Sequence, residues 1–461
     1  MLRLSPESLG TLPDGVARPS FDRTQLRPGI VHVGLGAFAR AHLLPATDAA
    51  LAANGDLRWG VVGVSLRQPG TRDALAPQQG LYTLALRDGG SSQLQVVGSL
   101  LAVLVAPEDP EAVLQRLADA DTRIVSLTIT EKGYHAQPDG AADYVARALR
   151  RRRALGRGGF TLLSCDNLPA NGRALRRVVL ERAGALQAGL ADWVDAHCRF
   201  PCCMVDRIVP RTTDADREQV DAALGLHDAW PVLGEPFMDW AIEDDFAAGR
   251  PDWAAGGARF VPAAAPFEQL KLRMVNGAHS ALAYLGTLAG LRTVDQAVAD
   301  PALQAFVDAL LRDEVQPTLP PLPGLDVDDY RRRLLQRFAN PALQHQLLQI
   351  AMDGSQKIPQ RWLATLRDRL AAGQGIDRLA LCVAAWLRFL QGTNEAGVAH
   401  TIDDPLAAPL AQAATAPGDV TAFEPVFGDL HRDPRFGQAL ARQQRLLATL
   451  GALAAARVAA S

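Results

Sequence analysis

The sequence predicts an α/β protein in which a domain built on a mostly parallel β-sheet is followed by an all-helical domain. In the first part of the chain, short apolar segments typical of buried strands alternate with amphipathic helical segments. Such alternation is typical of a parallel sheet covered by helices on both faces. After Pro262 and Pro266 strand signals become few, and Ala- and Leu-rich helical segments follow one another. A length of 461 residues suits two domains, which we place at residues 1–262 and 263–461.

The elements of the first domain are expected in a definite order. Residues 30–35 (IVHVGL) are an apolar run that ends in a glycine-containing turn, so they form the first strand, and residues 38–53 form the first helix. Residues 81–97 are expected to pair antiparallel at an edge of the sheet. Apolar runs predict further strands at 60–64, 81–86, 123–129 and 159–164, and helical periodicity predicts helices at 109–119, 142–155 and 173–189.

In the second domain, connections that carry Pro and Gly separate the helical segments. Helices are expected at 267–290, 301–315, 327–338, 341–352, 360–373, 376–391 and 434–457.

Composition excludes several classes of function. A net charge of −3 argues against a nucleic-acid-binding or anionic-membrane surface. We find no secretory signal and no uncharged stretch long enough to span a membrane. Five cysteines, an odd number, suit a reducing cytoplasm. Cys198, Cys202 and Cys203 lie beside His197, but their spacing lacks a second ligand pair, so no metal site is expected.

The expected partner is a small molecule, and the expected state is a monomer or small homo-oligomer.

A dinucleotide fingerprint follows the first strand and opens the first helix. Gly34, Gly36 and Ala39 occupy the three positions of the G-x-G-x-x-G/A motif. Gly34 permits the tight turn, Gly36 lets the backbone approach a pyrophosphate, and Ala39 allows close packing of helix on strand. The motif predicts a Rossmann-type domain that binds NAD.

The end of the second strand bears on the choice between NAD and NADP. The acidic residue that would bind the ribose hydroxyls is missing, and Ser65 and Arg67 stand there instead. Because a serine and an arginine tolerate a 2′-phosphate, NADP is not excluded. Phe38, Arg40 and Glu131 complete the predicted cofactor-binding set.

Lysine is rare in this chain, and one lysine has the setting of a general acid/base. Only three of the 47 Lys and Arg residues are lysine: Lys132, Lys271 and Lys357. On one α-helix over 267–286, Lys271, Asn276 and His279 fall within an arc of roughly 140°. A buried lysine beside a cationic nicotinamide has a lowered pKa, which suits proton exchange in alcohol–ketone hydride transfer. Glu268, one turn earlier, could pass protons to solvent.

Lys132 follows the strand at 123–129, whose carboxyl end faces the ligand side of such a sheet. We expect it to bind a substrate carboxylate. An ion pair with Glu131, or a cofactor contact, is an equally good interpretation.

Several segments occur in order with the fingerprint: SCDNLPANG (164–172), MVDRIVP (204–210), EPFMDWAIED (235–244), KLRMVNGAHSALAYLG (271–286) and MDGSQKIPQRW (352–362). Together they resemble the mannitol dehydrogenase family of zinc-free long-chain polyol dehydrogenases, over nearly the whole chain. The resemblance implies a Rossmann-type N-terminal domain and a helical C-terminal domain, with substrate bound between them.

The resemblance also implies roles for individual residues. Lys271 corresponds to the family's general acid/base, Asn276 and Asn167 to the amides that hold the reacting oxygen, and His279 to a residue that orients a hydroxyl. Asp206 and Lys357 resemble its sugar-binding residues, and Glu268 its proton-channel carboxylate.

Two positions depart from the family pattern. Ala39 stands where the family commonly has histidine, and HQLLQIA (345–351) lacks an arginine that polyol-oxidising members carry near the substrate. Within the family, TEKGY (130–134), MVDRIVP and QIAMDGSQK are most similar to the fructuronate reductase branch, which interconverts D-mannonate and D-fructuronate with NAD(H). The alternatives are oxidation of uncharged polyols, such as mannitol or arabinitol, and a non-catalytic dinucleotide sensor.

Overall fold

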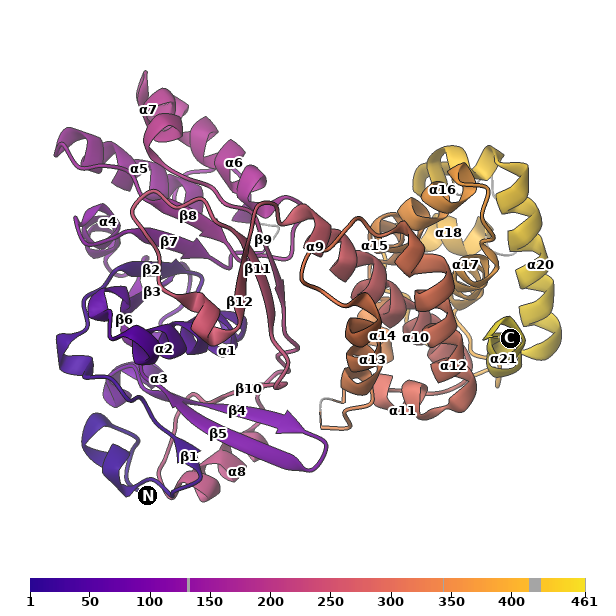
Figure 1. Ribbon diagram of the computed structural model, residues 1–461, viewed down its shortest axis with the longest axis horizontal. Helices are drawn as coiled ribbons and strands as arrows, with labels where there is room; N and C mark the ends of the chain where they lie inside the picture. The colour runs from indigo at the N-terminus through magenta and orange to yellow at the C-terminus, as the bar shows by residue number, and fades with distance from the viewer. Residues whose placement is uncertain (131–132, 343, 414–423, 461) are drawn as a thin grey trace. The chain divides into compact units, whose positions relative to one another are not determined.

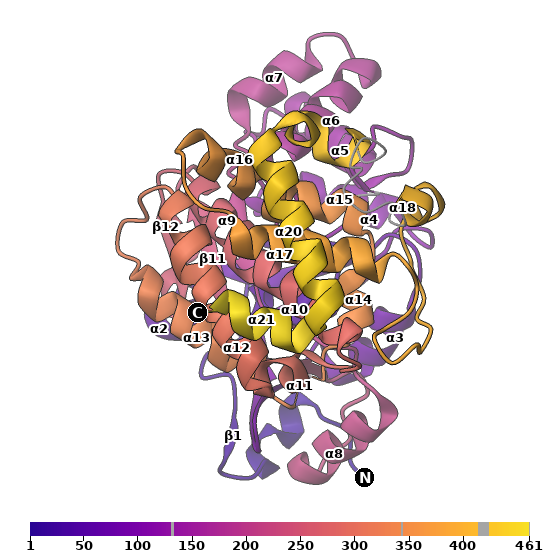
Figure 2. The same cartoon turned by 90° about the vertical axis from the view of Figure 1, so that its right-hand side faces the viewer.

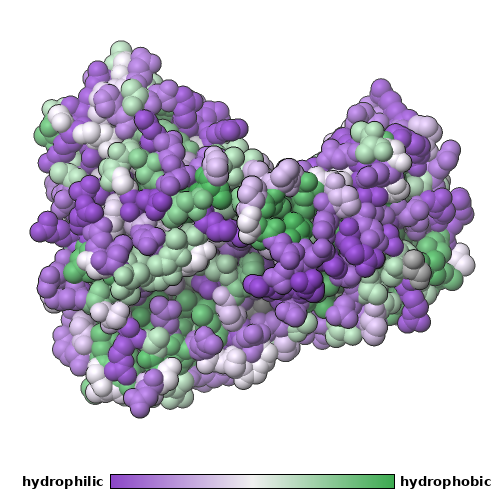
Figure 3. All heavy atoms as spheres, in the orientation of Figure 1, coloured by the Kyte–Doolittle hydropathy of each residue, from purple (hydrophilic) through white to green (hydrophobic). Residues whose placement is uncertain are grey.

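The computed structural model describes residues 1–130, 133–342, 344–413 and 424–460, which fall into two compact units. The first unit is Met1–Ala265 and the second is Pro266–Ser461. The surface visible in Figure 3 mixes hydrophilic side chains with smaller apolar areas in both units. Among the described residues, no helix is both long and apolar enough to cross a membrane.

The central sheet of the first unit is five-stranded and fully parallel, with the order β6-β3-β2-β7-β8 (Figure 1). The chain starts at the middle strand, proceeds to one edge through β3 and β6, and then continues on the other side with β7 and β8. This reversal lies between β2 and β7, the position where open parallel sheets bind ligands. The strands are β2 (Ile30–Val33), β3 (Val61–Ser65), β6 (Leu100–Val105), β7 (Ile124–Leu127) and β8 (Thr161–Ser164). The parallel sheet is as predicted, although β6 was not foreseen.

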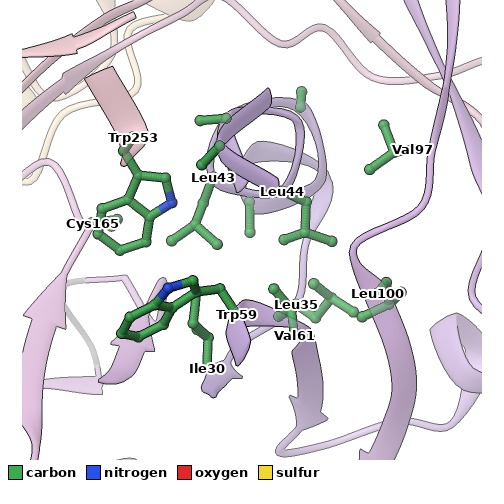
Figure 4. Close-up of a cluster of buried hydrophobic side chains, with 14 of the residues drawn as sticks. Ile30, Leu35, Leu43, Leu44, Trp59, Val61, Val97, Leu100, Cys165 and Trp253 are labelled. Carbon is green, nitrogen blue, oxygen red and sulfur yellow. The ribbon is translucent and has the colours of Figure 1, made fainter. Parts of the chain in front are cut away.

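Each face of this sheet carries a hydrophobic core, because successive residues of a strand point to opposite faces. On β2, Ile30 belongs to one buried cluster and Val31 to the other. Figure 4 shows the first cluster, in which Leu43 and Leu44 of α2 lie over Trp59, Ile30 and Val61, and Trp253 lies beside Leu43. The helices of this unit are α1 (Ala37–Ala41), α2 (Leu43–Asn54), α3 (Gly70–Leu75), α4 (Pro110–Ala118), α5 (Ala141–Ala154), α6 (Asn171–Leu186), α7 (Leu190–His197) and α8 (Asp214–Leu224).

The single helix predicted over 38–53 is wrong, since the structure breaks it at His42 between α1 and α2. Pro45 supplies the physical reason. It has no N–H, so it cannot bond to the carbonyl of Ala41 four residues earlier, as an uninterrupted helix requires. The guanidinium of Arg207 donates to that Ala41 carbonyl instead.

Two smaller sheets complete the first unit. One has the order β1-β5-β4-β10 and the other β12-β11-β9. The antiparallel pairing predicted within 81–97 is correct, because β4 and β5 pair from Tyr82↔Val97 to Asp88↔Ser91. Its placement at an edge of the main sheet is wrong, since β4 pairs with β10 in a separate sheet. These strands are β1 (Val16–Ala17), β4 (Tyr82–Asp88), β5 (Ser91–Val97), β9 (Cys203–Asp206), β10 (Val232–Gly234), β11 (Asp239–Glu243) and β12 (Ala258–Val261).

The second unit is built from helices, and its described residues form only isolated β-bridges. Helix α17 packs against both α10 and α20, and α20 runs across it in Figure 2. Three π-helices interrupt the α-helices, at Lys271–Asn276, Leu310–Val315 and Pro359–Leu363. The α-helices are α9 (Ala265–Leu270), α10 (Gly277–Leu288), α11 (Val294–Ala299), α12 (Pro301–Ala309), α13 (Val327–Phe338), α14 (Leu347–Ala351), α15 (Gly354–Ile358), α16 (Ala364–Ala371), α17 (Asp377–Phe389), α18 (Ala407–Ala413), α19 (Glu424–Phe427), α20 (Pro434–Leu450) and α21 (Ala452–Ala460).

The helix predicted over 341–352 is present only as α14. Before it, the Asn340 side chain accepts a hydrogen bond from the Ala342 N–H, and Gln344 has a left-handed φ of 44°. Gln346 then forms an antiparallel bridge with Thr293. These contacts satisfy the backbone locally and prevent an earlier start of the helix.

Candidate active site

The glycine turn after β2 has two glycines that are required for different reasons. Gly34 has a φ of 91°, and a Cβ there would lie 2.2 Å from the Thr128 carbonyl oxygen, so the fold itself demands glycine. At Gly36 the nearest protein atom to such a Cβ is 3.8 Å away, and φ is −97°. The protein therefore tolerates a side chain at Gly36, and close approach of a pyrophosphate explains the glycine. Ala39 is buried in the core between helix and sheet.

A buried histidine that sequence analysis missed supports this turn. His32 on β2 is fully buried, with Nδ1 2.9 Å from Ser126 Oγ and Nε2 2.9 Å from Thr128 Oγ1. Thr128 donates its only hydroxyl proton to the Gly34 carbonyl, at 2.7 Å. It must therefore accept a hydrogen bond from Nε2–H of His32, which fixes the tautomer of the ring. Burial lowers the pKa of His32 to about 4, so the ring is neutral near pH 7.

The other predicted cofactor residues lie near the carboxyl ends of β2 and β3. Ser65 donates a hydrogen bond to the Gln68 carbonyl, and Arg67 is exposed. Arg40 is only 5% exposed and donates to the Trp230 carbonyl at 2.6 Å, with its guanidinium over the Tyr82 ring. Burial lowers the pKa of Arg40 to about 10. One of its N–H groups thus serves the fold, and its contact with a cofactor stays a prediction.

Phe38 is half-buried and stacks on His42. Glu131 and Lys132 lie outside the described residues.

Asp166 ties together the carboxyl ends of β7 and β8. Its carboxylate accepts hydrogen bonds from the backbone N–H groups of Ile129 and Thr130, at 3.0 and 2.8 Å, and from the Tyr134 hydroxyl. Thr130 has a left-handed φ of 61°, a strained conformation that this clamp stabilises. Asn167, the next residue, is exposed at the ligand-binding edge of the sheet. Asp206 is buried at the end of β9, opposite Asp239 of β11.

Lys271, Asn276 and His279 lie on one continuous helical segment, as predicted, but its geometry differs from a plain α-helix. Each is buried, with exposed fractions of 9%, 9% and 8%. Lys271–Asn276 is a π-helix, whose hydrogen bonds join residues five apart. The angle of roughly 140° calculated between Lys271 and Asn276 for an α-helix is therefore wrong. The wider π turn brings two residues five apart closer to the same side of the helix. Glu268 is half-buried on α9, one turn earlier.

His279 stands in an apolar and electropositive environment. Its ring stacks on Phe338 with centroids 4.1 Å apart, and the His345 ring meets it edge-on at 5.6 Å. No described residue forms a hydrogen bond with His279 Nε2. The pKa of His279 is well below its usual value, first because of burial and then because of His345, Arg337, Arg361 and Lys271. A buried neutral imidazole with one free ring nitrogen can bind a hydroxyl or a carboxylate.

The MDGSQK segment is held rigidly against the second unit's core. Asp353 has a left-handed φ of 54°, and a Cβ on Gly354 would lie 2.6 Å from both Trp386 Nε1 and the Tyr284 hydroxyl. Lys357 donates to the Met352 carbonyl at 2.6 Å, and burial lowers its pKa. A strained residue in a rigid turn is a common way to position a binding group.

Arg361, which sequence analysis did not single out, lies directly beside the helical segment that carries Lys271, Asn276 and His279. Its guanidinium donates to Ser280 Oγ at 2.7 Å and to the Asn276 carbonyl at 3.4 Å. Burial lowers its pKa to about 10, so it remains a cation near pH 7.

Two family models and several relatives show to which family the chain belongs. The mannitol dehydrogenase Rossmann domain matches residues 28–255, and the mannitol dehydrogenase C-terminal domain matches residues 264–447. The chain belongs to the mannitol dehydrogenase family. As a member, it is an NAD-dependent oxidoreductase that acts on CH–OH groups of polyols or sugars.

Three relatives illustrate the range of the family. Mannitol 2-dehydrogenase of Phaeosphaeria nodorum is 40% identical over 94% of this chain and 82% of its own length. D-mannonate oxidoreductase of Escherichia coli is 42% identical over 85% of this chain and 86% of its own. The ternary complex of Pseudomonas fluorescens mannitol 2-dehydrogenase with NAD and D-mannitol is 37% identical, covers 99% of both chains and has a TM-score of 0.85.

Proposed function

We propose that this protein interconverts D-mannonate and D-fructuronate with NAD(H). One observation carries the choice of a sugar acid over an uncharged polyol. The ionisable side chains that shift the pKa of His279 are all basic, namely His345, Arg337, Arg361 and Lys271, and of these the arginines and the lysine can carry a positive charge near pH 7. A positive field at a buried binding group favours a substrate that carries a carboxylate.

Two further observations support this choice. The Escherichia coli D-mannonate oxidoreductase is as similar to this chain as the mannitol 2-dehydrogenases are. In addition, HQLLQIA (345–351) lacks the arginine expected of polyol-oxidising members. The two groups of relatives are close in identity, so we base the choice between them on the electrostatic observation.

The residues of the site suit this reaction. NAD, when bound, accepts a hydride from the carbinol carbon. Lys271 in its neutral form takes the hydroxyl proton during oxidation and, as an ammonium, returns it during reduction. The amides of Asn276 and Asn167 donate hydrogen bonds to the oxygen as it gains negative charge. His279 orients a neighbouring oxygen through its free Nε2, and Glu268 exchanges the proton of Lys271 with solvent.

Asp206 and Lys357 bind the sugar chain in this proposal. The glycine turn is suited to NAD, because no protein atom fills the space beside Gly36 and a pyrophosphate can approach the backbone there. All five cysteines are free and buried, and free thiols suit a cytoplasmic location.

A substrate panel tests the proposal. The panel measures oxidation of D-mannonate and D-mannitol with NAD, and reduction of D-fructuronate and D-fructose with NADH. We expect kcat/KM to be at least about tenfold higher for each acid than for its uncharged counterpart, which is the effect of one charge-assisted contact. A preference for mannitol or arabinitol would support the polyol alternative and contradict this one. Absence of turnover with every substrate would instead support a dinucleotide sensor. The same panel with NADPH decides the cofactor preference.

A further inference from the structure

The second unit holds a pair of imidazoles, and each has one buried ring nitrogen without a hydrogen-bond partner among the described residues. These atoms are Nε2 of His279 and Nδ1 of His345. The two rings meet edge-on with centroids 5.6 Å apart. Buried polar atoms in proteins nearly always have a partner. Two neighbouring exceptions beside a catalytic helix therefore point to a ligand that binds both.

The backbone of His345 fixes the position of its ring. The His345 carbonyl accepts a hydrogen bond from the Val294 N–H at 3.0 Å, and the Leu347 N–H donates to the Arg292 carbonyl at 2.9 Å. Between them, Gln346 pairs with Thr293. These contacts hold the segment before α14 against the start of α11. The His345 side chain as a whole is half-buried, whereas its Nδ1 is buried, so this nitrogen faces inward from the edge of the packed region.

The charge around the pair indicates which chemical group it binds. Burial lowers the pKa of His345, so near pH 7 the ring is neutral and has one N–H to donate. Lys271, Arg337 and Arg361 act on the adjacent His279 as positive charges. A hydroxyl gains little from such a field, whereas a carboxylate gains a charge-assisted hydrogen bond.

We propose that His345 is a specificity-determining residue whose Nδ1–H binds the carboxylate of the sugar acid, next to His279. This inference rests on the proposed function. It adds a contact that neither the motifs nor the spacing of the catalytic helix indicated.

A matched control is available in the same unit. His400 is also half-buried and stacked on a phenylalanine, Phe389, with centroids 4.3 Å apart, and its Nδ1 also has no described partner. Its Nε2 bonds to the carbonyl of the same Phe389 on which its ring stacks, a residue with no part in the proposed reaction. If a free Nδ1 on a stacked ring is a general structural feature, the two histidines will respond alike to substitution.

The experiment compares His345→Leu, His345→Asn and His345→Gln with His400→Leu. Dissociation constants for D-mannonate and D-mannitol are measured by calorimetry on the enzyme–NADH complex, which cannot oxidise an alcohol. His345→Leu should weaken D-mannonate binding about 10- to 100-fold, the value of a charge-assisted hydrogen bond, and D-mannitol binding by less than about threefold. His345→Asn should retain most of the affinity, because its amide occupies the region of Nδ1, whereas the longer His345→Gln should not. His400→Leu should leave both constants unchanged.

Three outcomes would overturn the inference: an effect of His345→Leu below about twofold, an equal loss for both ligands, or an equal loss in His400→Leu. Equal NADH affinity and equal melting temperature in His345→Leu and His400→Leu show that the variants are folded. Failure of the proposed function has a different signature, since the wild-type enzyme would then prefer D-mannitol in the substrate panel. If the wild type prefers D-mannonate but His345→Leu leaves D-mannonate affinity unchanged, the proposed function stands and only the role of His345 is contradicted.

Discussion

Lys271 and Asn276 are the first and last residues of a single π-helix. In an α-helix they would be separated by roughly 140° around the axis, and the i→i+5 pattern reduces that separation. Lys271, the proposed general acid/base, and Asn276, proposed to bind the reacting oxygen, are thus brought closer to the same side of the helix by a local change in hydrogen bonding. Single π-helical turns within α-helices often occur at functional sites for this reason.

Deletion of Leu272 tests whether the π-helix is needed. One residue fewer restores i→i+4 bonding and leaves Lys271 four residues before Asn276, about 40° away around an α-helix. The wider turn is lost, however, so the Lys271 side chain is displaced from the position that it has in the π-helix. Because displacement of a reacting group by about 1 Å can cost 100-fold in rate, we expect kcat to fall by at least about 100-fold. Deletion of Arg312, an exposed residue of the π-helix Leu310–Val315, is the control for loss of a π turn elsewhere. Similar kcat values for the two deletions would contradict the prediction.

Substitution of Lys271 tests the acid/base role itself. Lys271→Ala should lower kcat by about 10² to 10⁴, the usual contribution of a positioned acid or base, while NADH binding stays near the wild-type value. Lys271→Arg should be almost as slow, because a guanidinium keeps its proton at any working pH. Steady-state kinetics and NADH fluorescence titration measure both. Activity of the Arg variant within about threefold of wild type would rule out proton exchange by Lys271.

The two glycines of the fingerprint should respond differently to alanine. Gly34→Ala places a Cβ 2.2 Å from the Thr128 carbonyl at a φ of 91°, so it should lower the melting temperature as well as NADH affinity. Gly36→Ala meets no protein atom within 3.4 Å, so it should leave the melting temperature unchanged and weaken only NADH binding. Thermal unfolding without cofactor, followed by NADH titration, separates the two effects. A Gly36→Ala variant that binds NADH normally would show that the pyrophosphate does not approach this residue.

The parallel sheet could be predicted because its central strands are buried on both faces. Such strands form continuous apolar runs, as in Ile30–Val33. Apart from β4 and β5, the strands of the smaller sheets were missed for the converse reason. In β11, Asp239 and Glu243 interrupt the apolar pattern, and β10 has only three residues. Short strands with charged residues have no distinctive composition, so their pairing depends on contacts that are distant in the sequence.

The site was predictable where its residues share one helix. Lys271, Asn276 and His279 could be placed together from spacing alone, but the π-helix between them leaves no trace in composition. His345 and Phe338 come from segments far along the chain and meet His279 only through tertiary packing. The same holds for His32, which reads in the sequence as one residue of an apolar strand. Its two hydroxyl partners, Ser126 and Thr128, belong to the neighbouring strand and its end.

The buried His32 should make the stability of the first unit depend on pH. Its pKa in the folded state is about 4, below the unfolded value of 6.5, because burial disfavours the imidazolium. As pH falls from 6.5 to 4, the unfolded state gains a proton that the folded state does not. His32 should therefore lower the free energy of unfolding over that range by up to roughly 3 kcal/mol. Above pH 6.5 its contribution is constant.

Urea unfolding of wild type and His32→Leu at pH 7.0 and pH 4.5 isolates this effect. The variant is less stable at pH 7.0, because Ser126 and Thr128 lose their partner, but it lacks the titrating group. The difference in stability between the two proteins should therefore shrink at pH 4.5. A difference that is the same at both pH values would mean that His32 does not titrate in this window.

Activity should survive complete removal of metal ions. Zinc binds cysteine as a thiolate, yet burial raises the pKa of Cys202 and raises that of Cys198 to about 11. Cys198 and Cys203 belong to cores on opposite faces of the sheet, and Cys203 Sγ donates to the Ser164 carbonyl at 3.0 Å. No group of three or more His, Cys, Asp or Glu suited to a metal occurs among the described residues.

The ammonium of Lys271 and two amides can instead stabilise the developing alkoxide. After extended dialysis against a chelator, kcat and melting temperature should match the untreated enzyme, and elemental analysis should find far less than one zinc per chain. A loss of activity that added Zn²⁺ restores would show that a metal takes part.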